Sequence, residues 1–409
     1  MRKVWALYGL AGLALLAASL PAPLRAESAG QLAPFQMVRS LQLVQDRIAA
    51  GDHAAMPMQR KLLEMIDARL LAADKEIFDE PRNYRALLVY GMSGGNPATI
   101  EKVLSRLTLD EEKRGIGRGV LDYLNGQTIS ARSTLGPVDP MKLEPGLGAF
   151  LALVKGSVAS AENPQAALKL FDTVRLLGPG TLIEEAALRR SIDLAASLGE
   201  TERFTLASTQ YVNRYLLSPY AAQFADSFVS GVVTLQASVD LERIADITAM
   251  MDAERRRTIY LRIARRAAID GFKDLAAFAS AKAEDSTPTG VKDPRALLYA
   301  SLSSVTSGTA SEINALLEDI DRRKLSQGDR KLYDAVAAVA AKLTGALPAT
   351  GPATLPAAEE IEAPQALMPA APEPAADAKV DAADPIEAEL TEARRKLDEI
   401  DKLLAEDVQ

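Results

Sequence analysis

The chain has 409 residues, a formal net charge of −8, no cysteine and a single histidine. The absence of cysteine excludes disulfides, a lipoprotein anchor and thiolate metal sites, so the fold must be stabilised by buried apolar surface. The acidic balance argues against nucleic acid and anionic lipid as partners and favours a protein or the cell wall. With one histidine and no calcium-loop spacing, we expect no metal or other cofactor.

The first 26 residues have the layout of a secretory signal peptide. Arg2 and Lys3 precede an apolar run from Val4 to Leu20, which is followed by Pro21, Pro23 and a small-residue end at Ala26. This pattern predicts cleavage and a mature chain that begins near Glu27. An uncleaved signal anchor is the alternative, because the apolar run is close to the minimum length for a membrane span. No second run of this kind follows, so we expect no stable membrane insertion after cleavage.

The next stretch predicts a pair of helices joined by a short loop. Two apolar stripes recur at spacings of three and four residues, as on one face of a helix. Between them lies AAGDHAAMP, in which Gly51 suits a helix C-cap and Asp52 can start a turn or cap the second helix. His53 therefore falls in the interhelical loop, and we interpret it as a turn residue rather than a catalytic base. The two stripes are Met37, Leu41, Val44 and Ile48, and Met58, Leu62, Ile66 and Leu70.

The segment YGMSGGNPATIEKVL contains the pattern G-x-S-x-G around Ser93. A nucleophilic serine of this kind requires a strand, a tight turn and a helix, together with a histidine that accepts the proton. Here the only histidine precedes the serine, and the neighbouring segments have helical spacing. The sequence therefore favours a glycine-rich helix end, followed by a second helix with Asn96 as its cap and Pro97 at its first position. For KRGIGRGV, close helix packing is likewise favoured over a phosphate loop.

Spaced alanines, large apolar residues and prolines then recur along the chain. Ala167, Phe171 and Pro179 share their spacings with Ala207, Tyr211 and Pro219, and Ala131 with Leu135 repeats the first two positions. An alanine that admits a neighbouring helix, followed one turn later by a large apolar residue, resembles the second helix of a tetratricopeptide repeat. We therefore predict an all-α fold, a solenoid of TPR-like helical hairpins over residues 27–343. Stacked pairs of this kind expose a long surface that binds other proteins.

A basic run occurs within one of the later predicted helices. It consists of Arg255, Arg256 and Arg257 with Arg262, Arg265 and Arg266, which lie on one or two faces of the helix. The candidate binding residues among them are Arg255, Arg256, Arg262 and Arg266. Two interpretations remain open: a solvated helix face, or a site that binds an acidic partner surface.

The last part of the chain changes in composition. Residues 344–385 hold eight of the 22 prolines and seven acids against one lysine, which predicts a disordered acidic linker. Residues 386–409 predict a short amphipathic helix with a heptad stripe that includes Leu390, Leu397 and Leu404. This stripe is too short for a stable isolated helix, so it either meets a partner helix or remains a frayed tail.

Taken together, the stretch MVRSLQLVQDRIAAGDHAAMPMQRKLLEMIDARL resembles the N-terminal signature of the MotC family, periplasmic motility proteins of rhizobia and related alphaproteobacteria. The likeness extends to PRNYRALLVYGMSGGNP and to the proline-rich acidic tail. It implies a non-enzymatic periplasmic protein that binds the periplasmic part of the stator protein MotB and is needed for flagellar rotation. No active-site residues are implied. The alternatives are a periplasmic helical-repeat adaptor in envelope assembly and an exported hydrolase that uses Ser93.

Overall fold

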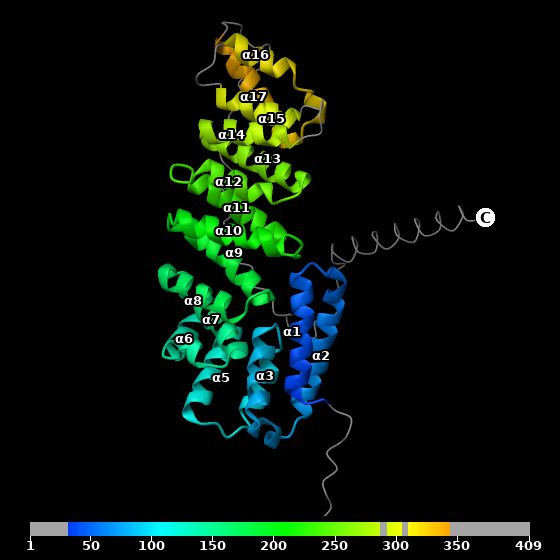
Figure 1. Cartoon of the computed structure of the whole chain (residues 1–409), viewed down its shortest axis with the longest axis vertical. Coiled ribbons are helices and arrows are strands. Elements are labelled where there is room, and N and C mark those ends of the chain that lie inside the picture. The colour runs from blue at the N-terminus through cyan, green and yellow to red at the C-terminus, as the bar shows by residue number, and fades with distance from the viewer. Residues whose placement is uncertain (1–31, 287–292, 305–309, 344–409) are drawn as a thin grey trace, which may run out of the picture. The chain divides into compact units, whose positions relative to one another are not determined.

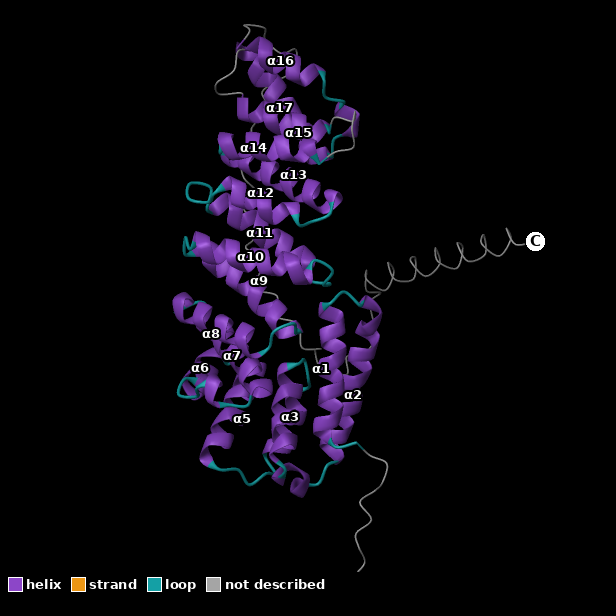
Figure 2. Cartoon of the chain, in the orientation of Figure 1, coloured by secondary structure: helices purple, strands orange, loops and turns teal. Residues whose placement is uncertain are grey.

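The computed structural model describes residues 32–286, 293–304 and 310–343. Within these ranges the protein consists only of helices and the loops between them (Figures 1 and 2). The all-α prediction is therefore confirmed. None of the described helices is both long and apolar enough to cross a membrane. The predicted signal segment, the linker 344–385 and the C-terminal helix 386–409 lie outside the described residues.

The described helices have the following bounds. The first half of the chain contains α1 (Pro34–Ala49), α2 (Met56–Ala72), α3 (Pro81–Met92), α4 (Pro97–Leu104), α5 (Glu111–Leu124), α6 (Thr128–Leu135), α7 (Pro145–Ala159) and α8 (Pro164–Leu177). The second half contains α9 (Leu182–Ser197), α10 (Thr201–Tyr215), α11 (Ala221–Thr234), α12 (Leu241–Ala249), α13 (Ala253–Asp270), α14 (Lys273–Asp285), α15 (Pro294–Ser304), α16 (Ala310–Glu318) and α17 (Gln327–Leu343). Short 3-10 turns occur at His53–Ala55 (η1), Lys75–Asp79 (η2), Pro140–Lys142 (η3) and Arg322–Lys324 (η4).

Consecutive helices pack as hairpins, and a glycine on the first helix admits a large residue of the second. A Cβ on Gly119 of α5 would lie 2.5 Å from the Leu135 side chain of α6, and one on Gly156 of α7 would lie 2.5 Å from the Phe171 ring of α8. Both large residues are fully buried. The close helix packing predicted for KRGIGRGV is thus confirmed at Gly119, and a side chain at either glycine would separate the two helices.

Five polar contacts between neighbouring hairpins have nearly the same separation along the chain. Their partners are 34 to 36 residues apart, about the length of one tetratricopeptide repeat. Each hairpin therefore touches the next at equivalent positions, as expected of a helical repeat. The pairs are Gln165–Glu200, Arg175–Gln210, Arg189–Gln223, Asp226–Arg262 and Arg257–Asp293.

The apolar core divides into two large clusters. One contains residues from Met37 to Val154, and the other runs from Leu188 to Ala340 and also includes Ala49 of α1. A small cluster around Phe171 lies on α7, α8 and α9, between the two in the chain.

The N-terminal hairpin follows the prediction on α1 but only partly on α2. All four predicted stripe residues of α1 are buried. On α2, Ile66 and Leu70 are buried and Leu62 is half-buried, whereas Met58 is exposed. The prediction for Met58 is therefore wrong: it lies in the first turn of α2, beside rather than on the face that meets α1. Asp52 makes no side-chain cap and instead pairs with Arg47.

The turn of this hairpin contacts a loop far away in sequence. Gly51 has a left-handed φ of +102°, and a Cβ there would lie 2.6 Å from Cβ of Leu217, in the loop after α10. Nε2 of His53 lies 2.9 Å from the Leu217 carbonyl oxygen. Nearby, Oδ1 of Asp46 lies 3.4 Å from the backbone nitrogen of Leu182, the first residue of α9. The turn and the end of α1 therefore tie the first hairpin to the second half of the chain.

Two buried glutamates fasten α9 to α10. Glu185 accepts hydrogen bonds from Nε of Arg189 at 2.8 Å and from the Tyr211 hydroxyl at 2.7 Å. Glu184 accepts from the Tyr215 hydroxyl at 2.7 Å and from Nη1 of Arg214 at 2.6 Å. Nη2 of Arg189 also donates to Oε2 of Glu185 at 3.1 Å, so every carboxylate oxygen has a donor, which is what a buried charge requires.

Ser93 lies at a helix end, as the sequence favoured. The ALLVY segment is helical, and Ser93 is the C-cap of α3. Asn96 then caps α4, since its Oδ1 accepts a hydrogen bond from the Ala98 backbone nitrogen at 3.0 Å, and Pro97 is the first residue of that helix. A helix rather than a strand leads into the serine, so the strand, turn and helix of a nucleophile elbow are not formed.

Candidate protein-binding surface

The predicted arginines lie on α13, a helix with a clear start and end. Oδ1 of Asp252 caps it by accepting a hydrogen bond from the Arg255 backbone nitrogen at 2.9 Å, and this bond holds the pKa of Asp252 below its usual range. Gly271, with φ +80°, ends the helix in the left-handed conformation. One face is buried, so the arginines occupy the remaining faces. The buried residues are Ile259, Tyr260, Leu261, Ile263, Ala264 and Ala267.

All four selected arginines have partners within the chain. Arg255 pairs with Asp252, and Nε of Arg266 lies 2.8 Å from Oδ2 of Asp270, so these two bonds stay close to α13 itself. Nε of Arg256 donates to the Ser286 hydroxyl at 3.1 Å, while Arg262 pairs with Asp226 of α11. Each guanidinium has five N–H donors, so capacity for a partner carboxylate remains. Binding of a partner by these residues stays a prediction.

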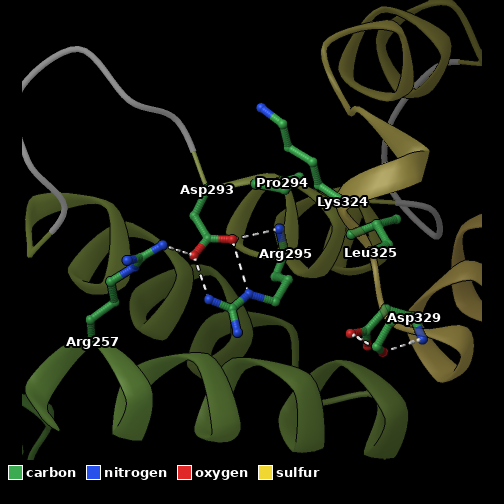
Figure 3. A pocket seen from close by; sticks show the side chains of 8 residues that line it. Arg257, Asp293, Pro294, Arg295, Lys324, Leu325 and Asp329 are labelled. Atoms are coloured by element: carbon green, nitrogen blue, oxygen red, sulfur yellow. Dashed lines mark hydrogen bonds and ion pairs between the residues drawn. The ribbon is translucent and has the colours of Figure 1, made fainter. Parts of the chain in front are cut away.

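A pocket with a cavity volume of about 590 Å³ lies beside α13, where α15 and η4 approach it (Figure 3). Its centre is the buried carboxylate of Asp293. Oδ2 of Asp293 accepts from Nη2 of Arg295 at 2.9 Å and pairs with Arg257, and its Oδ1 accepts from Nε of Arg295 at 3.1 Å. The lining residues are Arg257, Asp293, Pro294, Arg295, Lys324, Leu325, Ser326 and Asp329.

A second buried carboxylate, Asp329, supports the same pocket from α17. Its Oδ1 accepts from the Tyr299 hydroxyl at 2.9 Å and from Nε of Arg265 at 3.2 Å. Its Oδ2 accepts from the Ser326 hydroxyl at 2.7 Å. Burial raises the pKa of the Tyr299 hydroxyl, and the Asp329 charge raises it further, so the phenol stays protonated as a donor. Lys324 differs from these residues because it is exposed and extends away from the two carboxylates (Figure 3).

Asp293 should make the protein sensitive to acid. Burial raises the pKa of Asp293, but hydrogen bonds from Arg295 and Arg257 outweigh burial and hold the pKa below its usual range. A carboxyl with a lowered folded-state pKa stabilises the fold above its unfolded pKa, and this contribution is lost as the pH falls through the folded value. We expect Asp293→Asn to be less stable at neutral pH and to lose less stability between pH 5 and pH 3. Urea unfolding at several pH values measures this, and parallel pH profiles for both proteins would contradict it.

The two candidate catalytic side chains do not meet. The Ser93 hydroxyl is buried and has no hydrogen-bond partner, whereas the His53 ring faces the Leu217 carbonyl. Within the described ranges, no group of three or more acidic or histidine side chains is placed to hold a metal ion.

Comparison with known proteins defines the family. The family model described as "Chemotaxis protein MotC" matches residues 1–409. A protein of that name from Rhizobium meliloti (strain 1021) is 39% identical over 421 aligned positions, which cover 95% of this chain and 97% of the relative. The chain belongs to the MotC family. No solved structure matches it significantly.

The MotC resemblance in the sequence is thereby confirmed, and its most specific stretch can be placed on the fold. It covers most of α1, the turn η1 and most of α2, the hairpin that contacts Leu217. Leu390, Leu397 and Leu404, the other predicted binding residues, lie outside the described residues.

Apart from Arg257, which belongs to the basic run, sequence reasoning missed the residues that line the pocket of this MotC chain. The run Asp293-Pro294-Arg295 carries a local signal, because an acid followed by proline is typical of a helix start. Nothing in the sequence indicates that Arg257, 36 residues earlier, reaches the same carboxylate.

Proposed function

We propose that this chain is a non-enzymatic periplasmic protein that supports rotation of the flagellar motor by binding the periplasmic part of the stator protein MotB. The main support is membership of a motility family over residues 1–409. The N-terminal sequence adds an export signal, which fits a periplasmic location.

The helical repeat favours binding as the mode of action. Neighbouring hairpins contact each other at a regular separation, and arrays of this kind present extended surfaces to other proteins. A binder of this type acts by preferring one conformation of its partner, and the shift cannot exceed the difference between its affinities for the two states. We propose that it stabilises one state of the stator protein.

We propose that MotB contacts this chain at the pocket beside α13. Asp293 holds Arg257 and Arg295 in place, and the exposed Lys324 adds a cation at the rim. Such a fixed cationic rim fits a carboxylate-bearing segment of the partner.

Reversing the charge at the rim should weaken this interaction. Lys324→Glu is expected to weaken MotB binding about fivefold, since one exposed charge pair contributes up to ~1 kcal/mol. Calorimetry or surface plasmon resonance with the purified MotB periplasmic domain measures the change. Lys102→Glu, an exposed lysine on α4, is the matched control and should bind like the parent. If the parent, Lys324→Glu and Lys102→Glu proteins bind MotB with equal affinity, the contact lies outside the pocket. That result would not refute MotB binding itself.

The function itself is tested with the unaltered chain and in cells. Saturable binding to MotB at micromolar concentration and paralysed deletion cells with intact flagella are the expected results. Absence of saturable binding would refute the proposed partner. Normal swimming together with envelope defects would instead indicate the envelope-assembly adaptor.

A further inference from the structure

Helix α9 carries a half-buried arginine whose charge has no partner. Arg190 lies near the middle of this helix, and within the described ranges its guanidinium makes no hydrogen bond and no ion pair. The other half-buried arginines of these ranges do have polar partners, as Arg175 has in Asp172 and Arg189 in Glu185. Arg190 is therefore an exception that the packing of the helices does not explain.

The burial of this charge is not compensated by its neighbours. Burial lowers the pKa of Arg190, and so does the adjacent Arg189, while Tyr123 and Glu185 raise the pKa only in part. Glu185 cannot serve as the counter-charge, because both of its oxygens already accept hydrogen bonds from Arg189 or Tyr211. A buried cation without a counter-charge is unfavourable, so Arg190 destabilises the protein in its unbound state.

The other acidic side chains of α9 face different helices. Glu184 accepts hydrogen bonds from Arg214 and Tyr215 of α10, and Asp193 accepts one from Ser227 of α11. Helix α7 packs against both α5 and α9 and lies between them in Figure 1, and its sequence contains no acidic residue. Neither α7 nor α9 therefore provides a carboxylate for Arg190.

Tyr123 of α5 supplies a second donor near this charge. The residue is half-buried, and its hydroxyl has no hydrogen-bond partner in the part of the chain that the structure describes. It lies close enough to Arg190 for the two groups to interact electrostatically. The planar guanidinium fork fits the two oxygens of a carboxylate, and a phenol can donate one more hydrogen bond. The pair therefore has the donors of a carboxylate site.

We propose that Arg190 and Tyr123 bind a carboxylate that an aspartate or glutamate of a partner protein presents. The carboxylate supplies the counter-charge that the chain itself lacks at this position. A protein is the expected source, because helical repeats present extended surfaces to other proteins. The site lies on α5 and α9 rather than in the pocket beside α13. The inference goes beyond the proposed function and does not depend on MotB.

The uncompensated charge can be detected in the unbound protein by thermal unfolding. In the chain from residue 27 onwards, Arg190→Met is expected to raise the melting temperature by about 2 °C, because an apolar side chain of similar length avoids burying the charge. Arg189→Met should instead lower the melting temperature by about 5 °C, since it leaves the buried Glu185 without its cation. Arg118→Met, at an exposed position of α5, is the matched control and should leave it unchanged. An unchanged or lower melting temperature for Arg190→Met would overturn the proposal, because the guanidinium would then be compensated within its own fold.

Binding is measured by NMR on the Arg190 guanidinium itself. In isotope-labelled protein, the Nε–H signal of Arg190 is the one that the Arg190→Met spectrum lacks. A blocked tripeptide with a central glutamate should shift this signal saturably, and it should bind about tenfold more tightly than its glutamine counterpart, because only the glutamate carries a charge. The Nε–H signal of Arg118 is the control and should not shift.

The remaining comparisons test the second donor and the class of ligand. Tyr123→Phe should weaken binding of the glutamate peptide about threefold, because one neutral hydrogen bond is lost. The absence of a saturable shift of the Arg190 signal with the glutamate peptide would overturn the proposal. Tighter binding of inorganic phosphate than of the glutamate peptide would also overturn it, because the site would then take a phosphate group.

Discussion

Replacing Glu185 with alanine is expected to lower the free energy of unfolding by about 3–5 kcal/mol, the usual effect of breaking a buried charge pair. The carboxylate is fully buried, and its loss leaves the Tyr211 hydroxyl without its acceptor and leaves the Arg189 guanidinium with only its bond to Gln223. Burial raises the pKa of Tyr211 and persists in the variant, so the phenol cannot ionise to compensate. Urea unfolding followed by circular dichroism measures the loss.

Two further variants test whether the loss of stability comes from the buried network of Glu185. Glu162→Ala removes a glutamate that pairs with Arg132 at an exposed site, and it should cost less than about 1 kcal/mol. Combining Glu185→Ala with Tyr211→Phe should cost less than the sum of the two single changes, because both act on one network. Strict additivity would show that Glu185 and Tyr211 are not energetically coupled.

Gly51→Ala is expected to lower the free energy of unfolding by about 3 kcal/mol. A non-glycine residue with a left-handed backbone costs roughly 1–2 kcal/mol, and overpacking typically adds ~1–3 kcal/mol. Here the new Cβ would lie 2.6 Å from Cβ of Leu217 and 3.0 Å from its carbonyl oxygen. Hydrogen exchange should also become faster in the η1 turn and around Leu217, where the contact is lost.

A second glycine with positive φ separates the cost of the left-handed backbone from the cost of the overlap with Leu217. Gly199 has a similar φ of +74°, but a Cβ there would meet nothing within 4 Å, so Gly199→Ala should cost only the backbone part, about 1–2 kcal/mol. His53→Ala removes only the contact to the Leu217 carbonyl and should cost about 1 kcal/mol. Equal costs at Gly51 and Gly199 would mean that the turn moves away from Leu217 without penalty.

Local patterns in the sequence predicted the helices well. The stripe on α1 is buried as expected, and Asn96 and Pro97 start α4, because capping and apolar spacing are properties of a few neighbouring residues. Met58 was assigned to the core because it lies four residues before Leu62, but each step of four residues turns about 40° around the helix, so the start of the line leaves the face that meets α1. On α2 the buried line is Ile66 and Leu70.

The candidate site was harder to predict because its contacts join residues far apart in the chain. The arginines of α13 were recognised as a group, but the sequence could not show that Arg262 pairs with Asp226 and Arg257 with Asp293. Such pairs depend on how one hairpin stacks on the next. The family was recognised because the N-terminal stretch is specific, and recognition does not require the fold.

The contact between the η1 turn and Leu217 also affects the order in which the protein can fold. In a chain that emerges N-terminus first, α1 and α2 appear about 165 residues before the loop that receives His53. Helix α9, which packs against the end of α1, also arrives late. The first hairpin must therefore stay incompletely packed while more than a third of the protein is still to come, and during that interval its apolar surface is open to a chaperone or to aggregation.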